Sequence, residues 1–293
     1  MEVEKAPILV AVGDSVEEDA SLRFSAAEAM RTGRGLLAAH VVHGNVPVAP
    51  HNLLISYETA GEVGHHLVVE AAERLKKLTE QKVEIKTLVP RGGVVDKLVA
   101  LSRSVHMIVM QHREMSGLRR VFTGSVSSGV AGRASVEVVS VPEQWVAPHQ
   151  LFSRVVMGVG EWESAAGLVE HAFDLAEQHE AALRVIHASE LPLVYDETMV
   201  EHGELKRWHD EVTGRIDASL EAARRHHPGV TATVEVQHAR PADALFEASH
   251  EADLLVVGRR DTAHPVFEHL GSVTRAMLRL SRCPVDIVPR PLS

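Results

Sequence analysis

The chain has 293 residues, 45% of them hydrophobic and 24% charged, a length that predicts two domains and a balance that excludes disordered, collagen-like and low-complexity proteins. Its 30 basic and 40 acidic residues give a formal charge of −10, and because the acidic surplus falls mainly in residues 151–293, no nucleic-acid partner is expected. Neither a charged-then-apolar leader at Met1 nor an apolar run near the roughly 20 residues of a membrane span is present, so we expect a cytoplasmic protein with no membrane partner.

Short apolar runs separated by amphipathic stretches recur along the first half of the chain. Residues 7–12 form such a run, which ends at Gly13-Asp14 as is typical of a strand buried on both faces of a sheet. The other strands predicted in this half are residues 36–42, 83–89, 105–110 and 136–141.

Residues 143–152 show no clear hydrophobic period, and prolines at 142 and 148 bracket most of them. This composition predicts a linker between a first domain, 1–142, and a second domain, 153–293. Trp145 lies in the linker, and we expect it to pack against a domain rather than to bind a ligand.

The second half alternates in the same way. Its predicted strands are residues 155–159, 183–188, 230–236, 254–257 and 285–288. The clearest helix carries an apolar stripe at spacings of three and four, which would face a sheet and place Trp208 in the core. The stripe consists of Leu205, Trp208, Val212, Ile216, Leu220 and Ala223.

The two halves are copies of one unit, because equivalent residues differ by a constant 147 positions. The matched pairs are Gly13 and Gly160, His40 and His187, Asp96 and Asp243, Arg113 and Arg260, Gly124 and Gly271, Ser125 and Ser272, and Pro142 and Pro289. Strands that alternate with helices predict, for each copy, a doubly wound α/β domain with a five-stranded parallel sheet and helices on both faces. Ligands of such folds bind beyond the carboxyl ends of the strands, so the loops after the first and fourth strands are the candidate sites.

The loop after the fourth strand of the second copy runs from Gly258 to Gly271-Ser272, where a helix is expected to begin. A helix start presents unpaired amide N–H groups and the positive end of a dipole, and glycine lets a phosphate approach the backbone. Arg260 supplies a charged donor in the same loop. The alternative is that Ser272 is an ordinary N-cap and Gly271 an ordinary turn residue.

This loop resembles the nucleotide loop of the universal stress protein family. Glycine after the fourth strand, followed by Gly271-Ser272-Val273, is similar to the family's spaced motif. In the first copy, residues 116–127 are similar to the family's usual sequence in this loop. Residues 283–289 resemble the family's closing strand. The resemblance covers both halves and leaves out only the linker.

The resemblance implies a strand order of 3-2-1-4-5 in each domain, with closing strands that pair across a domain interface. It also implies adenine and ribose near the first and second strands and phosphates in the glycine loop, with ATP or another adenine nucleotide as ligand, with or without Mg²⁺. The implied phosphate positions are Gly258, Arg260, Gly271, Ser272 and Val273 in the second copy, and Arg113, Gly124, Ser125 and Val126 in the first.

Several residues depart from the family pattern. Asp261 and Glu114 replace the second loop glycine, and Gln111 replaces the first loop glycine that Gly258 keeps. A carboxylate about 4 Å from a phosphate charge is repelled by roughly 4 kcal/mol at an effective dielectric constant near 20. We therefore expect both sites to be weakened, the first more than the second. Nearby arginines at 119, 120, 259 and 260 would offset this repulsion. Alternatively, a bound Mg²⁺ ion would make Asp261 a metal ligand.

Other chemistry is not favoured by the sequence. The 19 histidines lack the spacing of a zinc motif, and there is no Walker loop or nucleophile elbow. The one cysteine, Cys283, is expected to be a buried apolar residue. The sequence thus predicts a non-enzymatic stress-response binding module that forms a homodimer through its closing strands, with a monomer as the alternative. Its rival is a signalling or structural adaptor that no longer binds nucleotide, and slow ATP hydrolysis would need a general base that the sequence does not place.

Overall fold

The structure is a computed structural model of the chain, and it describes residues 5–14, 20–43, 57–112, 120–146, 152–160, 165–190, 202–259 and 270–289. Side chains at 57–59, 120–125 and 202–205 lie outside this description. The chain divides into two compact units, Met1–Ala147 and Pro148–Ser293. Among the described residues no helix combines the length and apolar character needed to cross a membrane.

The described residues of the first unit form five strands and four helices. In chain order they are β1 (Ile8–Ala11), α1 (Ala20–Thr32), β2 (Leu36–Ala39), α2 (Tyr57–Leu78), β3 (Ile85–Leu88), α3 (Val94–Leu101), β4 (Met107–His112), α4 (Arg120–Arg133) and β5 (Glu137–Pro142). Its strands are parallel and follow the order β3-β2-β1-β4-β5.

The second unit repeats this pattern. It consists of β6 (Arg154–Gly158), α5 (Ala166–Gln178), β7 (Ala182–Ala188), α6 (His202–His226), β8 (Ala232–Gln237), α7 (Pro241–Ser249), β9 (Leu254–Gly258), α8 (Ser272–Leu280) and β10 (Val285–Val288). Its parallel strands follow the order β8-β7-β6-β9-β10. The predicted fold class and strand order are confirmed in both units, and all ten predicted strands are present, with ends that differ from the prediction by at most three residues.

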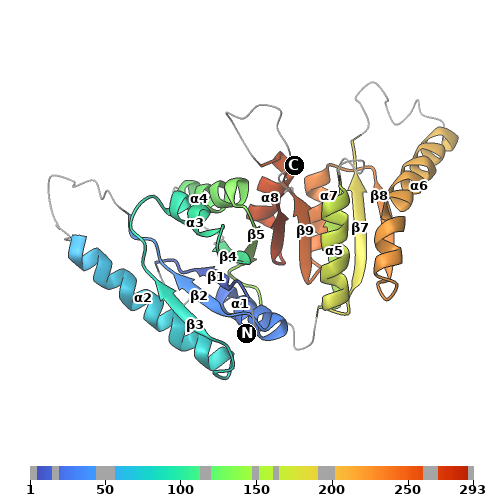
Figure 1. Ribbon diagram of the computed structural model, residues 1–293. Helices are drawn as coiled ribbons and strands as arrows, with labels where there is room; N and C mark the ends of the chain where they lie inside the picture. Colours follow the sequence, from blue (N-terminus) through green and yellow to red (C-terminus); the bar gives the residue numbers. More distant parts are fainter. Residues whose placement is uncertain are drawn as a thin grey trace. The chain divides into compact units, whose positions relative to one another are not determined.

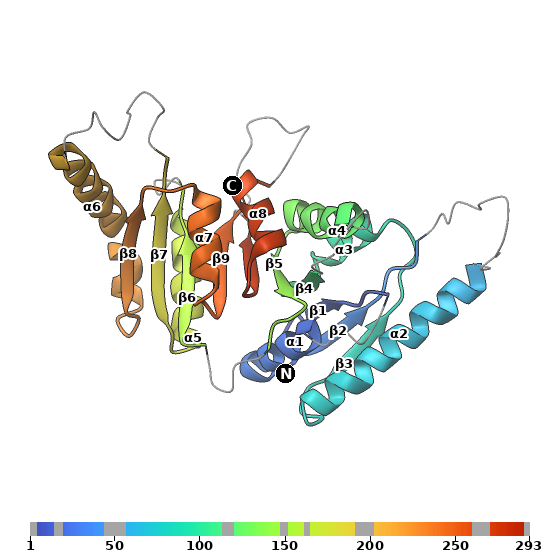
Figure 2. The ribbon, with the colours of Figure 1, turned by 180° about the vertical axis from the view of Figure 1, so that it is seen from behind.

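In each unit the helices cover both faces of the sheet (Figures 1 and 2). In the second unit α5 packs beside α6 and α7 packs beside α8, and in the first unit α1 pairs with α2 and α3 with α4. The central strands are therefore buried on both sides, which explains why their sequences are continuous apolar runs rather than alternating ones. Strand β6 shows this best, because Val155, Val156 and Met157 are completely buried.

The stripe predicted on α6 packs as expected along most of its length. Val212, Ile216, Leu220 and Ala223 are buried. Trp208 departs from the prediction of a core residue, because it is only half-buried and its ring lies 4.5 Å from that of His238. This position is near the start of α6, where the helix contributes less of its surface to the core.

Trp145 packs on the first unit, since its ring lies 5.8 Å from the Phe24 ring in an edge-to-face arrangement. This agrees with the expectation that the linker tryptophan is an anchor. Cys283 is also placed as predicted: it is buried, and this burial raises the pKa of its thiol to about 12.

Candidate functional site

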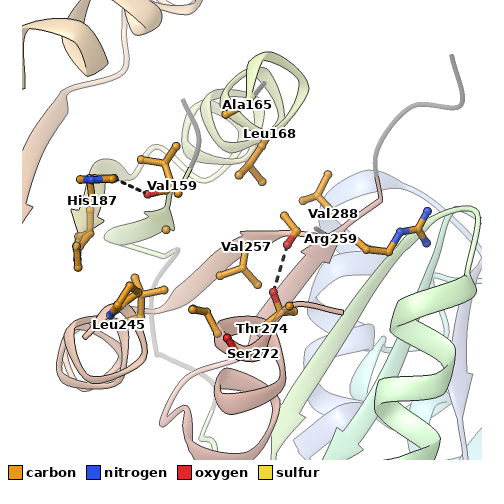
Figure 3. A pocket seen from close by; sticks show the side chains of 18 of the residues that line it. Val159, Ala165, Leu168, His187, Leu245, Val257, Arg259, Ser272, Thr274 and Val288 are labelled. Carbon is orange, nitrogen blue, oxygen red and sulfur yellow. Dashed lines mark hydrogen bonds between the residues drawn. The ribbon is translucent and has the colours of Figure 1, made fainter. Parts of the chain in front are cut away.

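A cavity of about 490 Å³ lies at the carboxyl ends of the strands in the second unit. The chain leaves β6 toward β7 on one side and returns to β9 on the other, so the cavity is at the point where the strand order reverses. This is where open α/β sheets bind their ligands. The lining residues come from the ends of four strands and the starts of three helices (Figure 3).

The cavity walls are mainly apolar. Val159, Leu168, Ile186, Leu245 and Val257 supply branched side chains from β6, α5, β7, α7 and β9. In Figure 3 these walls surround the space between His187 and Thr274. Apolar walls with few polar groups are typical of pockets that bind the ring of a small organic ligand, and 490 Å³ is within their usual range of roughly 300–1,000 Å³.

Three helices begin at the cavity, and among the described residues none of their N-cap side chains forms a capping hydrogen bond. The N-cap residues are Ala165 for α5, Arg240 for α7 and Gly271 for α8. The first N–H groups of a helix have no partner within the helix, so an uncapped start leaves them for water or a ligand. At α7 only the Ala242 N–H is left in this way, because Pro241 has no N–H and the Asp243 N–H donates to the Arg240 carbonyl oxygen at 2.9 Å. At α8 the first intrahelical bond is from Arg275 N–H to the Gly271 carbonyl, which leaves the N–H groups of residues 272–274 without an intrahelical partner. The positive ends of the helix dipoles therefore converge on one cavity.

The start of α8 is held against the end of β9. The Thr274 hydroxyl donates a hydrogen bond of 3.2 Å to the Gly258 carbonyl oxygen (Figure 3). Gly271 has φ −63° and ψ 160°, an extended conformation, so the helix begins at Ser272. This fixes the unpaired N–H groups in place before any ligand arrives, which is the preorganisation that an anion site needs.

Positive side chains are less prominent than the helix starts. Arg259 lines the cavity, but in Figure 3 its guanidinium points away from His187 and Leu245. Arg240 forms an exposed ion pair with Glu190 at 2.7 Å, and this carboxylate raises the pKa of the guanidinium. The described lining residues include no Asp or Glu.

The structure brings together four of the five predicted residues of the second copy. Gly258, Gly271, Ser272 and Val273 all line the cavity. The fifth, Arg260, lies outside the described residues, as does Asp261. His187, the repeat partner of His40, is also in the lining.

The first copy differs from the prediction. Gly124 and Ser125 were expected to begin a helix, as Gly271 and Ser272 do, but α4 begins at Arg120 and includes both of them. Residues 120–123 contain neither glycine nor proline, so nothing in the sequence stops the helix from starting earlier. The N–H groups of Gly124 and Ser125 are thus inside a helix, where carbonyls four residues earlier accept them. Val126 is half-buried in the same helix, and Arg113 and Glu114 lie outside the described residues.

Sequence reasoning did not name the contribution of the helix that follows the first strand. Ala165, Gly167 and Leu168 at the start of α5 form one wall of the cavity. The signal was available in the fold rule, because every helix that follows a parallel strand begins at the same edge of the sheet. The start of α7, with Pro241 and Leu245, follows from the same rule.

The universal stress protein family model matches residues 6–142 and 151–289 of the chain. A universal stress protein of Mycolicibacterium smegmatis is 27% identical over 293 residues, which cover 96% of each chain. A universal stress protein crystal structure from Archaeoglobus fulgidus aligns with 98% of this chain and 97% of its own, at 18% identity and a TM-score of 0.69, and so has the same fold. A shorter match, 26% identical with a TM-score of 0.33, is a universal stress protein in complex with cAMP and covers 47% of this chain and 98% of that one.

Proposed function

Because the chain belongs to the universal stress protein family, we propose that its second unit binds an adenine nucleotide in the cavity bounded by β6, β9 and α8. The base would occupy the apolar part near Val159 and Leu245, and the phosphates would accept hydrogen bonds from the N–H groups at the start of α8. The observation that carries the proposal is the meeting of three uncapped helix starts around one apolar cavity.

The test is isothermal titration of the full chain with ATP, AMP and adenosine, each with and without Mg²⁺. We expect ATP and AMP to bind more tightly than adenosine, because the phosphates interact with the helix start. GTP tests whether the apolar wall discriminates the base. If adenosine binds as tightly as ATP, the phosphate part of the proposal is wrong.

Ser272 provides a matched pair of variants. It is exposed at the first position of α8, where an acidic side chain stabilises a helix. Ser272→Glu therefore preserves the fold but places a carboxylate where the phosphate would bind. At about 4 Å this repulsion is worth about 4 kcal/mol near the protein surface, so we expect ATP affinity to fall by two to three powers of ten. Ser272→Ala removes only a hydroxyl, and we expect its affinity to stay within about fivefold, a loss of about 1 kcal/mol.

The proposal includes binding without turnover. The general base that ATP hydrolysis would need is not supplied by a carboxylate in the described lining, and His187 directs Nδ1 to a backbone carbonyl. We therefore expect no phosphate release above the rate of ATP in buffer. Metal dependence tests the role assigned to Asp261: if Mg²⁺ strengthens ATP binding and Asp261→Asn abolishes that gain, the carboxylate is a metal ligand rather than a source of repulsion.

The proposal also includes a cytoplasmic stress-response role and association as a homodimer. Light scattering on the purified chain distinguishes the dimer from the monomer. The rival function is an adaptor whose surface binds another protein while its cavities stay empty. Mass analysis of small molecules that copurify with the chain separates the two: an adenine nucleotide supports the binding module, and no binding at millimolar ATP supports the adaptor.

A further inference from the structure

The two units differ at the end of the fourth strand. In the second unit it is Gly258, whose lack of a side chain leaves space beside Leu168: a Cβ added there would lie 3.4 Å from Leu168 Cδ2. In the first unit the equivalent residue, 147 positions earlier, is Gln111. The register is the same in both sheets, because Gln111 pairs with Val141 and Gly258 with Val288.

The Gln111 side chain crosses from β4 to the start of α1. Its Oε1 accepts a hydrogen bond of 3.3 Å from the Ser21 N–H. Ser21 is the second residue of α1, so its N–H is one of those without a partner in the helix. Ser21 is also the equivalent of Leu168, which lines the cavity of the second unit. In the first unit the glutamine amide thus reaches the start of the helix that follows the first strand, whereas in the second unit Gly258 has no side chain and Leu168 faces the cavity.

Burial follows the same difference. Ser21 is buried with 5% of its surface exposed, whereas Leu168 is half-buried at the cavity wall. The Gln111 Nε2 atom is buried and has no hydrogen-bond partner among the described residues. Burying an amide N–H group without an acceptor costs free energy. This cost opposes the gain from the hydrogen bond that Oε1 accepts, so that bond alone does not explain why the side chain is buried.

We infer that Gln111 blocks the first unit's counterpart of the nucleotide cavity and caps α1 in place of a ligand, so that each chain binds a single nucleotide in its second unit. The inference rests on the proposed function for the number of ligands. The capping of α1 is independent of any ligand. A glutamine oxygen carries only a partial negative charge, and it satisfies a helix N–H that a phosphate would otherwise satisfy.

The first test transfers the block to the second unit in the full-length chain, with ATP as the titrant. Gly258→Gln should weaken ATP binding at least 100-fold, while circular dichroism and the melting temperature confirm that the variant is folded. Gly258→Ala adds only a Cβ, 3.4 Å from Leu168 Cδ2, so we expect a smaller loss of affinity than in Gly258→Gln. Gly214→Ala, at an exposed position of α6 outside the cavity lining, is the matched control, and we expect its affinity within threefold of the wild type. If Gly258→Gln is folded and binds ATP within threefold of the wild type, the inference is overturned.

Stoichiometry separates this inference from the proposed function. One ATP per wild-type chain, abolished by Ser272→Glu, agrees with both. Two ATP molecules per chain would overturn the block at Gln111 and leave the proposed function standing.

Amide hydrogen exchange tests, in the absence of any ligand, whether Gln111 caps α1. Gln111→Leu keeps the volume of the side chain but removes the acceptor, and we expect at least tenfold faster exchange at the Ser21 amide. Gln81→Leu, at an exposed position of the turn after α2, is the control. If no ATP binds to the wild type, the proposed function fails, while faster exchange still supports the cap. Unchanged Ser21 exchange in Gln111→Leu would overturn the cap.

Discussion

The Nδ1 atom of His187 lies 3.1 Å from the carbonyl oxygen of Val159 and joins the ends of two neighbouring strands at the cavity. The first unit has the same arrangement, in which His40 Nδ1 lies 3.0 Å from the Val12 carbonyl oxygen. Because a carbonyl only accepts, Nδ1 carries the proton in both rings. In each unit the imidazole therefore holds the end of the second strand against the end of the first strand.

This relationship predicts a loss of stability when the ring is removed. His187→Ala should lower the free energy of unfolding by about 1–3 kcal/mol, because a buried hydrogen bond and the packing of the ring are both lost. His187→Asn keeps a donor near Nδ1 and should lose less. His40 is more exposed than His187, so His40→Ala should cost less than His187→Ala. Urea unfolding measures all three, and equal stability of His187→Ala and the wild type would show that the bond contributes nothing.

A second histidine makes stability depend on pH. His227 is buried beside α5, where its Nδ1 donates to Glu177 at 2.9 Å and its Nε2 lies 3.4 Å from Glu170. Its other neighbours are Asp174, Phe173 and His226. The hydrogen bond with Glu177 is the largest cause that raises the pKa of His227 above its ordinary 6.5.

A raised pKa in the folded state means that the protonated ring stabilises the fold. This contribution is fully present below pH 6.5 and is lost as the pH rises through the folded pKa. His227→Gln cannot titrate, so the difference in unfolding free energy between the wild type and this variant should be larger at pH 5.5 than at pH 8.5. Ala222→Gln, at an exposed position of α6, exchanges one side chain without a titratable group for another; it is the control, and its difference from the wild type should not change with pH. A difference that is constant with pH would contradict the prediction.

Two glycines on either side of Val159, at and just after the end of β6, should respond differently to alanine. At Gly158 an added Cβ would lie 2.6 Å from Leu245 Cδ1, so that side chain must move, whereas at Gly160 no atom of the described part of the chain lies within 4 Å. Gly158→Ala should therefore destabilise the chain by about 1–3 kcal/mol and reduce the cavity. Gly160→Ala should stay within about 0.5 kcal/mol of the wild type. Thermal unfolding distinguishes them, and similar melting temperatures for both variants would refute the assigned packing.

The turn after the first helix of each unit offers a prediction of increased stability. Gly33 has φ +64° in the first unit, and its equivalent in the second unit is Glu180, with φ +55°. A residue with a side chain is strained in this left-handed region, whereas glycine is not. Glu180→Gly should raise the free energy of unfolding by about 0.5–1 kcal/mol, which is the relief of strain less the added freedom of the unfolded chain.

The reverse change is the matched control for this turn. Gly33→Ala should lower the free energy of unfolding by about 1 kcal/mol, since only Lys5 Nζ, 4.0 Å away, approaches the added Cβ and the backbone conformation alone opposes it. If Glu180→Gly is less stable than the wild type, contacts of the Glu180 side chain outweigh the strain.

The sequence alone determined the duplication, the ten strands and the edge of the sheet at which a ligand would bind. These follow from local rules, since apolar runs of four to seven residues and a constant offset of 147 positions are visible without any contact information. The tertiary structure decided which repeated residues remain equivalent. Gly271 and Gly124 occupy the same place in the repeat, yet one precedes a helix and the other lies inside one. The sequence shows only that Gln111 replaces a loop glycine, whereas the fold brings its amide to Ser21, 90 residues away. A helix boundary and a side-chain cap depend on neighbours distant in the chain, and only packing fixes those neighbours.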